Sequence, residues 1–322
     1  MNSFGTNFRI SVFGESHGKV VGVVIDGCSP GIDLSEEDFS EDIDRRRPGA
    51  KGTTTRVEED IPELLTGIYN GKTTGAPLTI LFHNRNVRSS DYEALRTIPR
   101  PGHADMAASV KFRGYNDPRG GGHFSGRMTL CLVAAGVVAK KMLASSSISI
   151  IARVTEAGGD EDIESALEKA YAANDSIGGI VECIAAGIPV GTGEPFFNSL
   201  ESMISHMVFS IPAIKGIEFG AGFAAAGMQG SMHNDAIIDK EGRTGTNNAG
   251  GITGGIANGN PLVFRVVVKP PSSTPKTQTS INLASGQLEE FSVKGRHDLC
   301  IALRVPVVLE AATAIVLADL LH

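Results

Sequence analysis

Three consecutive glycines at positions 120–122 lie just ahead of a long apolar segment, residues 128–139, and this junction constrains the fold more than any other stretch of the chain. Glycine adopts positive φ angles without steric penalty and lets the backbone approach a ligand closely. Ser125 stands between the two segments, where we expect it to cap the N-terminus of a buried helix over residues 128–143. A glycine loop that leads into a helix N-terminus is typical of an anion-binding site.

The residues around the glycines are polar and basic, which supports this interpretation. Residues 100–127 contain four arginines, two histidines and few bulky aliphatic side chains. In a core segment so many hydrogen-bond donors would lack partners, so we expect the stretch to line a surface or a cavity. A glycine triplet also occurs in ordinary polar loops, and the rest of the chain has to decide between the two interpretations.

Length and composition narrow the choice of partners. The 322 residues show no repeat, low-complexity linker or change in composition, which favours a single domain over residues 1–322. A hydrophobic content of 41% with 20% charged residues is typical of a soluble globular protein. The net charge of −7 argues against nucleic acid and acidic membranes as partners. Because 12 of the 17 arginines precede position 128, we infer local anion chemistry.

The cysteines and the N-terminus predict a cytoplasmic protein. The four cysteines stand singly in or beside apolar segments, so we expect buried free thiols in a reducing compartment, at Cys28, Cys131, Cys183 and Cys300. The first residues lack the basic and apolar regions of a signal peptide. The apolar segment at residues 128–143 is too short to span a membrane.

The hydrophobic pattern predicts alternating strands and helices. Alternating or β-branched apolar segments indicate strands at residues 8–13, 20–25, 64–69, 78–82, 148–154, 180–186, 214–219 and 262–268. Periodic segments with capping residues indicate helices at residues 35–47, 128–143, 161–173, 199–209 and 306–321. This order predicts an α/β (α+β) fold of mixed layers that begins with antiparallel hairpins.

Polar loops that interrupt this pattern hold candidate site residues. Ser16 and His17 lie in a glycine-bracketed turn between the first two strands, where they serve either catalysis or only the turn. Arg45, Arg46 and Arg47 end a helix, and cations at that end stabilise the helix dipole. Three consecutive arginines point in different directions, so we expect at least one of them to meet an anionic ligand.

A second glycine-rich tract covers residues 247–259. Two Gly-Gly pairs flanked by amides suit a flat aromatic ring or a phosphate that lies on the backbone. The tract matches neither Gly-x-Gly-x-x-Gly nor a Walker loop, so the sequence predicts neither a Rossmann site nor an NTPase. Lys269, followed by two prolines and then Ser272 and Ser273, is either a phosphate contact or the exit of an edge strand.

Three chemistries are open to the histidines. We predict no metal, because no His-x-x-x-His or His-Glu-x-x-His spacing occurs and the arginines would repel a cation. A Ser-His-Asp set from Ser16, His17 and Asp298 lacks the Gly-x-Ser-x-Gly elbow. Two histidines as acids and a carboxylate as base, in an arginine-lined pocket, suit elimination or transfer on a multiply anionic small molecule.

Taken together, the motifs resemble those of chorismate synthase over nearly the full length of the chain. Each motif is modest evidence, whereas seven of them in the family's order are highly specific. They are Phe13-Gly14-Glu15-Ser16-His17-Gly18, Asp44-Arg45-Arg46-Arg47-Pro48-Gly49, Arg100-Pro101-Gly102-His103-Ala104-Asp105, Arg119-Gly120-Gly121-Gly122, Asn248-Ala249-Gly250-Gly251 with Gly254-Gly255, Lys269-Pro270, and Gly295-Arg296-His297-Asp298.

The resemblance implies a homotetramer with a β-α-β sandwich fold of antiparallel sheets and a helical layer. It also implies a carbon–oxygen lyase that converts 5-enolpyruvylshikimate 3-phosphate to chorismate by 1,4-anti elimination of phosphate, the last step of the shikimate pathway towards the aromatic amino acids. The family requires reduced FMN without net redox change, and NADPH is the implied source of reducing equivalents. Breaking an allylic phosphate bond needs charge neutralisation and an electron-rich partner, which suits this cofactor.

The resemblance also assigns roles to residues. His17 matches the acid that protonates the departing phosphate, His103 the histidine that acts on the flavin, and Asp298 the carboxylate linked to flavin N5 and removal of the C6 proton. Ser16 and Ser125 match hydrogen-bonding helpers. The implied flavin contacts are His123, Phe124, Ser125, Pro212, Ala213, Asn248, Ala249, Gly254, Lys269, Pro270, Pro271, Ser272, Ser273 and Arg296.

The remaining basic residues are assigned to two other ligands. Arg46 and Lys51 match positions assigned to a pyridine nucleotide, NADP, in the family. Four arginines are candidates for bidentate pairing with the substrate's carboxylates and phosphate, namely Arg45, Arg47, Arg100 and Arg127.

The chain departs from the family pattern just after the glycine triplet. The usual Arg-x-Ser-x-Arg-Glu is here His-Phe-Ser-Gly-Arg-Met from His123 to Met128, which removes one basic and one acidic group but no assigned catalytic residue.

Two other classes of protein remain as alternatives. One is a phosphate-ligand binding protein without turnover, and the other is an arginine-rich RNA-binding module, which the net charge and the lack of interleaved aromatic residues disfavour.

Overall fold

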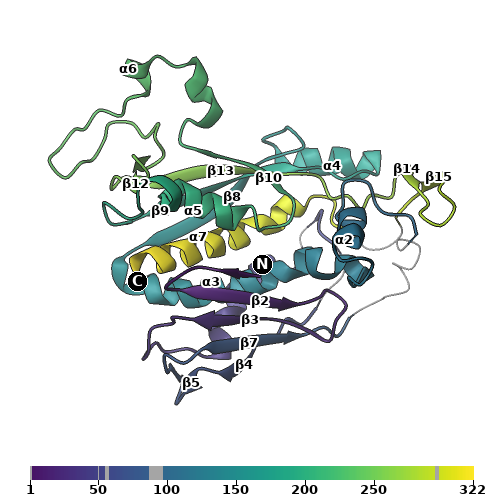
Figure 1. Ribbon diagram of the computed structural model, residues 1–322. Helices are drawn as coiled ribbons and strands as arrows, with labels where there is room; N and C mark the ends of the chain where they lie inside the picture. Colours follow the sequence, from purple (N-terminus) through teal and green to yellow (C-terminus); the bar gives the residue numbers. More distant parts are fainter. Residues whose placement is uncertain (1, 50, 55–57, 87–96, 294–296) are drawn as a thin grey trace.

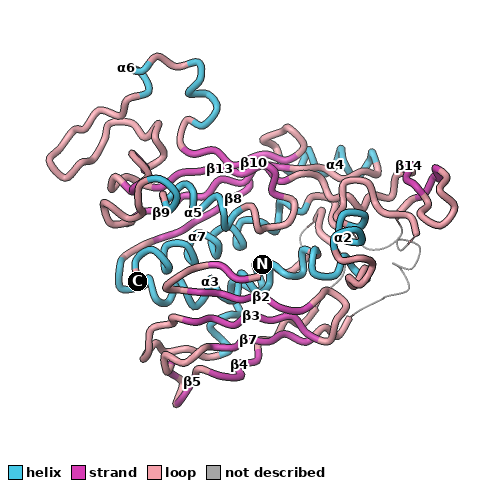
Figure 2. The backbone as a smooth tube through the Cα atoms, viewed as in Figure 1, coloured by secondary structure: helices cyan, strands magenta, loops and turns pink. Residues whose placement is uncertain are grey.

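Two antiparallel sheets enclose a layer of helices (Figures 1 and 2). The structure is a computed structural model that describes residues 2–49, 51–54, 58–86, 97–293 and 297–322. Its layers confirm the predicted α+β sandwich with a helical layer, and the physical reason is the predominantly apolar composition of the two central helices.

The first sheet is built mainly from the N-terminal part of the chain. Its strand order is β1-β2-β3-β7-β4, antiparallel throughout. The strands are β1 (Ser3–Phe4), β2 (Arg9–Gly14), β3 (Val20–Asp26), β4 (Glu63–Thr66) and β7 (Leu78–His83). The predicted strand over residues 64–69 is wrong in one respect. Gly67 has a φ of +81°, which breaks the extended backbone, so β4 ends at Thr66 and β5 (Ile68–Tyr69) pairs separately with β6 (Lys72–Thr73).

The second sheet comes from the later part of the chain and has strand order β10-β13-β9-β8. Its antiparallel strands are β8 (Ser149–Ala157), β9 (Gly179–Ala186), β10 (Ile214–Phe219) and β13 (Leu262–Val268). The predicted strands at residues 214–219 and 262–268 are confirmed at both ends, and β13 is rich in the β-branched residues that favour strands.

Helices α3 (Thr129–Leu143) and α7 (Val305–Leu321) form the middle layer. They are apolar on nearly all sides, as expected for helices buried between two sheets. Gly136 of α3 faces Ala311 of α7 so closely that a Cβ on Gly136 would lie 2.3 Å from Ala311 Cβ. The missing side chain therefore permits the close crossing of the two helices.

Both central helices, with the turns that precede or follow them, satisfy the length and hydropathy criteria for a membrane span. These segments are Gly126–Ser146 and Ile301–Leu321. Within the folded chain, 67% and 78% of their most apolar windows are buried, which is the environment of core helices.

Shorter helices surround this core, and their caps explain where they begin. The predicted helix over residues 35–47 consists of a 3-10 turn, η1 (Glu36–Phe39), followed by α1 (Ser40–Arg46). Helix α4 (Ile163–Ala173) begins two residues later than predicted because the Asp162 side chain caps it by accepting a hydrogen bond from the Ser165 amide. Helix α5 (Leu200–Val208) is capped in the same way by Ser199.

Several short elements were not predicted. Helix α2 (Asp105–Lys111) begins at the end of the Arg100–Asp105 motif. The hairpin of β14 (Gln278–Ile281) and β15 (Leu288–Phe291) lies near this helix (Figure 1). Residues 220–248, which we call the arm, carry η8 (Gly222–Gly227) and α6 (Gly230–His233) and project away from the sheets. A hairpin of β11 (Ile252–Thr253) and β12 (Ile256–Ala257) follows the arm.

Candidate active site

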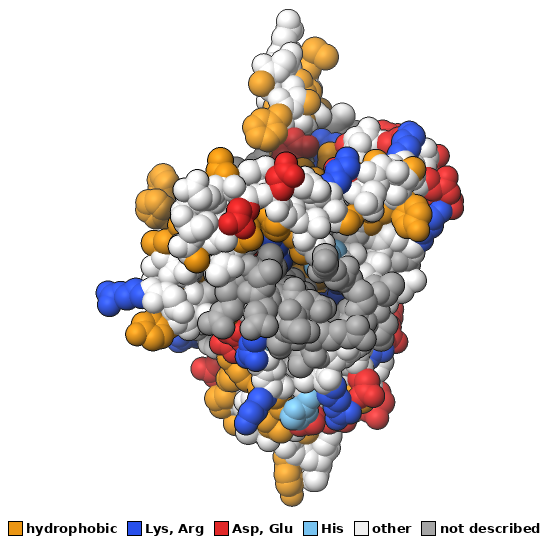
Figure 3. Space-filling view, turned by 90° about the vertical axis from the view of Figure 1, so that its right-hand side faces the viewer, with side chains coloured by type: hydrophobic (Ala, Val, Ile, Leu, Met, Phe, Trp, Pro, Cys, Tyr) orange, Lys and Arg blue, Asp and Glu red, His pale blue; other side chains and the backbone are white. Residues whose placement is uncertain are grey.

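A cavity of about 790 Å³ lies at the end of the molecule where α3 and α7 begin. Its wall includes Arg46 at the end of α1, Phe124 and Arg127 after the glycines, Ala213 before β10, and Asp298 before α7. Figure 3 views the molecule from this end and shows a hollow near the middle of the face. Segments far apart in the sequence therefore meet at one site.

The glycine triplet forms part of this wall and has the predicted backbone. Gly120, Gly121 and Gly122 have φ angles of +60°, +81° and +54°, in the region that favours glycine. The Ser125 side chain accepts a hydrogen bond from the Arg127 amide, so it caps the 3-10 turn η5 (Gly126–Met128) that leads into α3. The predicted cap is thus confirmed, one turn ahead of the α-helix proper.

Two histidines lie against consecutive glycines of the triplet. A Cβ on Gly120 would come within 2.4 Å of His17 Cδ2, and a Cβ on Gly121 would lie 3.3 Å from His103 Nε2. Gly120 lines the cavity, whereas His17 lies directly behind it and is 5% exposed. The absence of side chains at these positions therefore allows both imidazoles to pack on the loop.

Hydrogen bonds to its backbone atoms hold the turn that carries Ser16 and His17 from two sides. The Ser16 amide donates to the carbonyl of Gly122 at 3.1 Å, and the Asn84 side-chain amide donates to the carbonyls of Glu15 and Gly18 at 3.0 and 2.9 Å. Ser16 is 1% exposed, which is low for a polar side chain. These contacts fix the turn between the glycine loop and the end of β7.

His103 belongs to a compact group of charged residues. Its Nδ1 lies 2.5 Å from Asp105 Oδ1, and Arg100 forms a bidentate pair with the same carboxylate through Nε and Nη2, both at 2.8 Å. Burial alone would raise the pKa of Asp105, but hydrogen bonds from Arg100 and His103 outweigh it and hold that pKa well below its usual range. Arg100 Nη1 also donates to Ser273 Oγ at 3.0 Å, so this arginine is almost fully used inside the protein.

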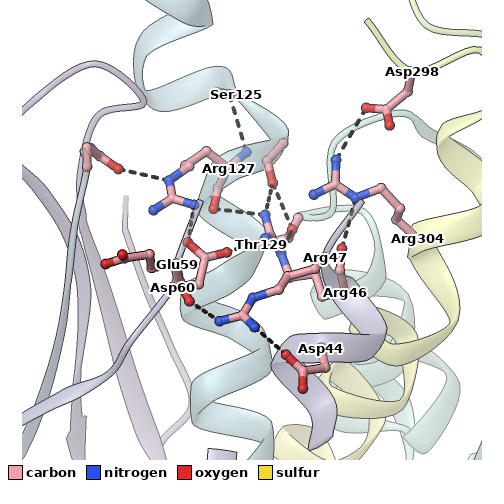
Figure 4. Close-up of polar contacts among 12 residues, drawn as sticks. Asp44, Arg46, Arg47, Glu59, Asp60, Ser125, Arg127, Thr129, Asp298 and Arg304 are labelled. Carbon is pink, nitrogen blue, oxygen red and sulfur yellow. Dashed lines mark hydrogen bonds and ion pairs between the residues drawn. The ribbon is translucent and has the colours of Figure 1, made fainter. Parts of the chain in front are cut away.

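A second charged group lies under the start of α3 (Figure 4). Asp60 Oδ1 accepts from Arg127 Nη1 at 2.5 Å, and its Oδ2 lies 3.6 Å from Arg46 Nη1. Both guanidinium groups are at least nine-tenths buried. Arg46 also donates to Thr129 Oγ1 and to the carbonyl of Gly126, each at 3.0 Å. Two buried cations thus share one carboxylate.

This sharing has electrostatic consequences. Burial, and then the positive charge of Arg304, lower the pKa of Arg46 to about 9, although Asp60 opposes this. Arg127 Nη2 is buried and has no hydrogen-bond partner among the residues that the structure describes. Because a buried donor without a partner is costly, the group is suited to receive an additional acceptor.

Asp298 faces the cavity from the segment before α7. Its Oδ1 accepts from the Thr54 amide at 2.9 Å, and its Oδ2 lies 3.3 Å from Arg304 Nη1. Arg304 Nε in turn donates to the carbonyl of Arg46 at 2.9 Å (Figure 4). An arginine and a backbone amide thus fix the position of this carboxylate at the cavity.

Another part of the cavity wall carries lysines and hydroxyls, mainly from the segment that follows β13. Lys269 Nζ donates to Ser272 Oγ at 2.7 Å, and Ser272 Oγ donates to the carbonyl of Gly102 at 2.7 Å. Burial, followed by the nearby charge of Lys215, lowers the pKa of Lys269. Ala213 has a φ of +76°, and its carbonyl accepts from the Lys269 amide at 2.9 Å.

The structure brings most of the predicted residues to the cavity. The predicted residues that line it are Arg46, Arg100, His103, His123, Phe124, Ser125, Arg127, Pro212, Ala213, Lys269, Pro271, Ser272, Ser273 and Asp298. His123 donates from Nδ1 to the carbonyl of Gly14 at 2.8 Å, and its Nε2 lies 3.2 Å from Asn2 Oδ1. Pro270 adjoins the lining residues, and Ser16 and His17 lie behind Gly120. Arg296 lies outside the described residues.

Three predicted basic residues point elsewhere. Arg45 pairs with the buried Glu310 at 2.7 Å and with Asp42 at 3.2 Å. Arg47 pairs with Asp44 and donates to the backbone of residue 59 (Figure 4). Lys51 pairs with Glu168 at 2.9 Å on the surface. Arg45 and Arg47 therefore stabilise the surroundings of α1 in this chain.

The second glycine-rich tract also lies away from this chain's cavity, beside the base of the arm. The amides of Asn248 and Ala249 bind the Asp235 carboxylate at 2.7 and 2.9 Å. Gly254 occupies the turn of the β11–β12 hairpin, with open space where a Cβ would be. Within one chain these three residues do not join the other predicted flavin contacts.

Several residues of the site were not singled out from the sequence. Asp60, Asn84, Asp105 and Arg304 each bind a predicted site residue directly, and Lys215 lines the cavity. Asp105 belongs to a quoted motif, but nothing in the sequence indicated its pairing. Asp60 and Asn84 reach the site only through long-range packing.

The charge of the cavity is unbalanced. Six cationic side chains line it among the described residues, namely Arg46, Arg100, Arg127, Lys215, Lys269 and Arg304. Three carboxylates face them, namely Glu58, Asp60 and Asp298. An excess of positive charge in a partly buried site suits a ligand with several negative groups.

Comparisons with known proteins identify the family. A family model described as chorismate synthase matches residues 8–322. A chorismate synthase from Chitinophaga pinensis is 66% identical over 319 residues, which cover 99% of this chain and 96% of that protein. A chorismate synthase from Methanocaldococcus jannaschii is 43% identical over 364 residues, covering 100% and 96%. A crystal structure of chorismate synthase superposes with a TM-score of 0.76 at 27% identity, covering 99% of this chain and 92% of that one.

Proposed function

The chain belongs to the chorismate synthase family, and we propose that the cavity at the start of α3 and α7 is its active site. The reaction is the elimination of phosphate from 5-enolpyruvylshikimate 3-phosphate, which makes the protein a lyase of aromatic biosynthesis. One observation carries the assignment of the site. Two histidines pack on consecutive glycines beside a cavity that also holds a fixed carboxylate and an excess of cations.

The residues present fit a flavin mononucleotide. A volume of about 790 Å³ lies within the range of roughly 300–1,000 Å³ typical of ligand sites. Phe124, Pro212 and Pro271 provide apolar surface for a flat ring, and Lys269, whose ammonium group Ser272 Oγ holds in place, provides a donor for a phosphate. When bound, reduced FMN supplies electron density to the reacting centre without net redox change. We propose NADPH as the source of its reducing equivalents.

We assign His17 and His103 as acids and Asp298 as the carboxylate of the base. We propose that His17, which packs on Gly120 beside the cavity, gives a proton to the departing phosphate. His103 Nδ1 faces Asp105, whereas its Nε2 lies against Gly121 and 3.2 Å from Arg100 Nη2. Asp298 is held in place by Arg304 and the Thr54 amide, and we propose that it accepts the proton. Ser16 and Ser125 support these groups by hydrogen bonds.

Charge pairing selects the substrate. Arg127 and Arg46 share the single carboxylate of Asp60, so the group has a net positive charge, and we propose Arg127 for a phosphate or carboxylate of the substrate and Arg46 for NADP. Arg100 is committed to Asp105 and Ser273, and we propose that it orients His103 while it lines the cavity. The desolvated setting strengthens each of these contacts relative to water.

We further propose a cytoplasmic homotetramer. Support comes from large apolar side chains that are exposed on one copy, including Phe223, Ile237 and Ile238 on the arm, at 84%, 73% and 66%. Exposed apolar groups gathered on one projecting segment indicate a protein contact. Asn248, Ala249 and Gly254, at and beyond the base of the arm, remain predicted flavin contacts.

An anaerobic assay tests the function. Purified protein is mixed with 5-enolpyruvylshikimate 3-phosphate under nitrogen, with reduced FMN, oxidised FMN or no flavin, and phosphate release is measured. We expect release only with reduced FMN. Flavin and substrate binding without any release would favour the alternative of a binding protein, and full turnover without flavin would refute the cofactor assignment.

A further inference from the structure

The Asn84 side chain connects the two parts of the site that must act together on a departing phosphate. Asn84 follows β7 directly and makes three side-chain hydrogen bonds. Two go from Nδ2 to the carbonyls of Glu15 and Gly18, on either side of Ser16 and His17, at 3.0 and 2.9 Å. The third goes from Arg127 Nε to Oδ1 at 2.8 Å.

The chemistry of the partners fixes the orientation of this amide. An arginine Nε only donates, so the Asn84 oxygen must face Arg127. Backbone carbonyls only accept, so the NH₂ group must face Glu15 and Gly18. All the hydrogen bonds that orient the amide therefore go to site residues. An aspartate at this position has the same shape, but it can accept from Arg127 and cannot donate to the two carbonyls.

The other contacts of Arg127 show what Asn84 contributes. Nη1 is taken by Asp60 and Nε by Asn84, which leaves Nη2 buried and without a partner among the described residues. The plane of the guanidinium is thus set by two acceptors, one on Nε and one on Nη1. Because that plane is rigid, fixing Nε and Nη1 also fixes the direction of Nη2.

We propose that Asn84 is a positioning residue that sets the His17 turn and Arg127 relative to each other. The inference rests on the proposed roles of these two residues. If Arg127 holds an anionic group of the substrate and His17 delivers a proton to it, their separation decides the rate. A misplacement of about 1 Å can cost on the order of 10²-fold in rate.

Two substitutions separate the two sides of the amide. Asn84→Asp keeps an acceptor for Arg127 Nε but turns its second oxygen towards the carbonyls of Glu15 and Gly18, so the turn loses two hydrogen bonds. Asn84→Ala removes the contacts on both sides. The matched control is Asn70→Asp, the same chemical change in an exposed turn between β5 and β6.

Steady-state kinetics with reduced FMN give the first readout. For Asn84→Asp we expect kcat to fall about 10- to 100-fold with KM within about threefold of the wild type. For Asn84→Ala we expect a similar loss in kcat together with an increase in KM of about 10-fold. A wild-type kcat in Asn84→Asp would overturn the proposal, as would equal changes in KM in both variants, because that pattern indicates general loosening.

A crystal structure of Asn84→Asp gives a readout that is independent of turnover. We expect the turn from Glu15 to Gly18 to move away from residue 84 while Arg127 stays on Asp60. A turn that stays in its wild-type position in Asn84→Asp would overturn the positioning role, whatever the activity of the variant. Conversely, a wild-type protein that releases no phosphate refutes the proposed function, and the displacement of the turn still decides the role of Asn84.

Discussion

Gly120 lies against the His17 imidazole so tightly that the first carbon of any side chain would come within 2.4 Å of His17 Cδ2 and 2.6 Å of Nε2. From the sequence, we expected the glycines to provide positive φ angles and to let the backbone approach a ligand closely. The structure adds a second reason, since the glycine is also the surface on which a proposed catalytic histidine rests. Gly121 has the same relation to His103 at 3.3 Å.

The first prediction follows from this contact. Gly120→Ala should lower kcat by about 10²-fold because the new methyl group displaces His17, with a smaller loss of stability from an alanine at positive φ. Kinetics and thermal unfolding measure the two effects. The matched control is Gly71→Ala, which has a φ of +71° and open space around the added carbon, so it should lose stability without losing kcat.

Removing either imidazole should affect turnover more than binding. For His17→Ala and His103→Ala we expect kcat to fall roughly 10²–10⁴-fold, the usual contribution of a positioned proton donor, with flavin and substrate affinity retained. Single-turnover kinetics and binding titrations measure the two quantities. His322→Ala, at the C-terminus, is the control. Wild-type turnover in either site variant would remove that histidine from the mechanism.

The charged group around Asp105 predicts a pH-dependent contribution to stability. Because the folded-state pKa of Asp105 is lowered, the ionised carboxylate stabilises the fold above its unfolded pKa of about 3.9, and this contribution is lost as the pH falls towards the folded pKa. Asp105→Asn should therefore reduce the free energy of unfolding by about 1–3 kcal/mol at neutral pH, the usual cost of a lost charged hydrogen bond.

Urea unfolding between pH 3 and 7 checks this prediction. The difference between wild type and Asp105→Asn should be constant above about pH 5 and should shrink below about pH 4. Asp33→Asn is a suitable comparison, since Asp33 pairs with Lys72 where both side chains are largely exposed. Surface pairs contribute only about 0–1 kcal/mol, so its effect should be small throughout. A difference for Asp105→Asn that grows on acidification would contradict the pairing seen here.

The four cysteines should be inert in the native protein. All are buried and free, and burial raises the pKa of Cys131 and of Cys183 to about 12, which keeps them as thiols at neutral pH. An aromatic disulfide reagent should detect four thiols in denaturant and essentially none within minutes in buffer. Rapid native labelling of one cysteine would show that its segment opens, and peptide mapping would identify it.

Part of this protein could be predicted from local sequence. The β-branched segment of β13 and the apolar segments of α3 and α7 have lengths and compositions typical of a buried strand and two buried helices, and the structure contains them. Ser125 as a cap and positive φ in the glycine triplet follow from equally local rules. The family motifs also identified the segments that meet at the cavity.

Other features depended on which residues meet in three dimensions. Arg45, Arg46 and Arg47 are adjacent in sequence, but successive helical residues point about 100° apart, so only packing decides that Arg46 faces the cavity while Arg45 binds Glu310. Asn84 and Asp60 reach Arg127 across 43 and 67 positions of sequence. Pattern and propensity report on neighbours along the chain, whereas the partners of these side chains were set by how two sheets close around α3 and α7.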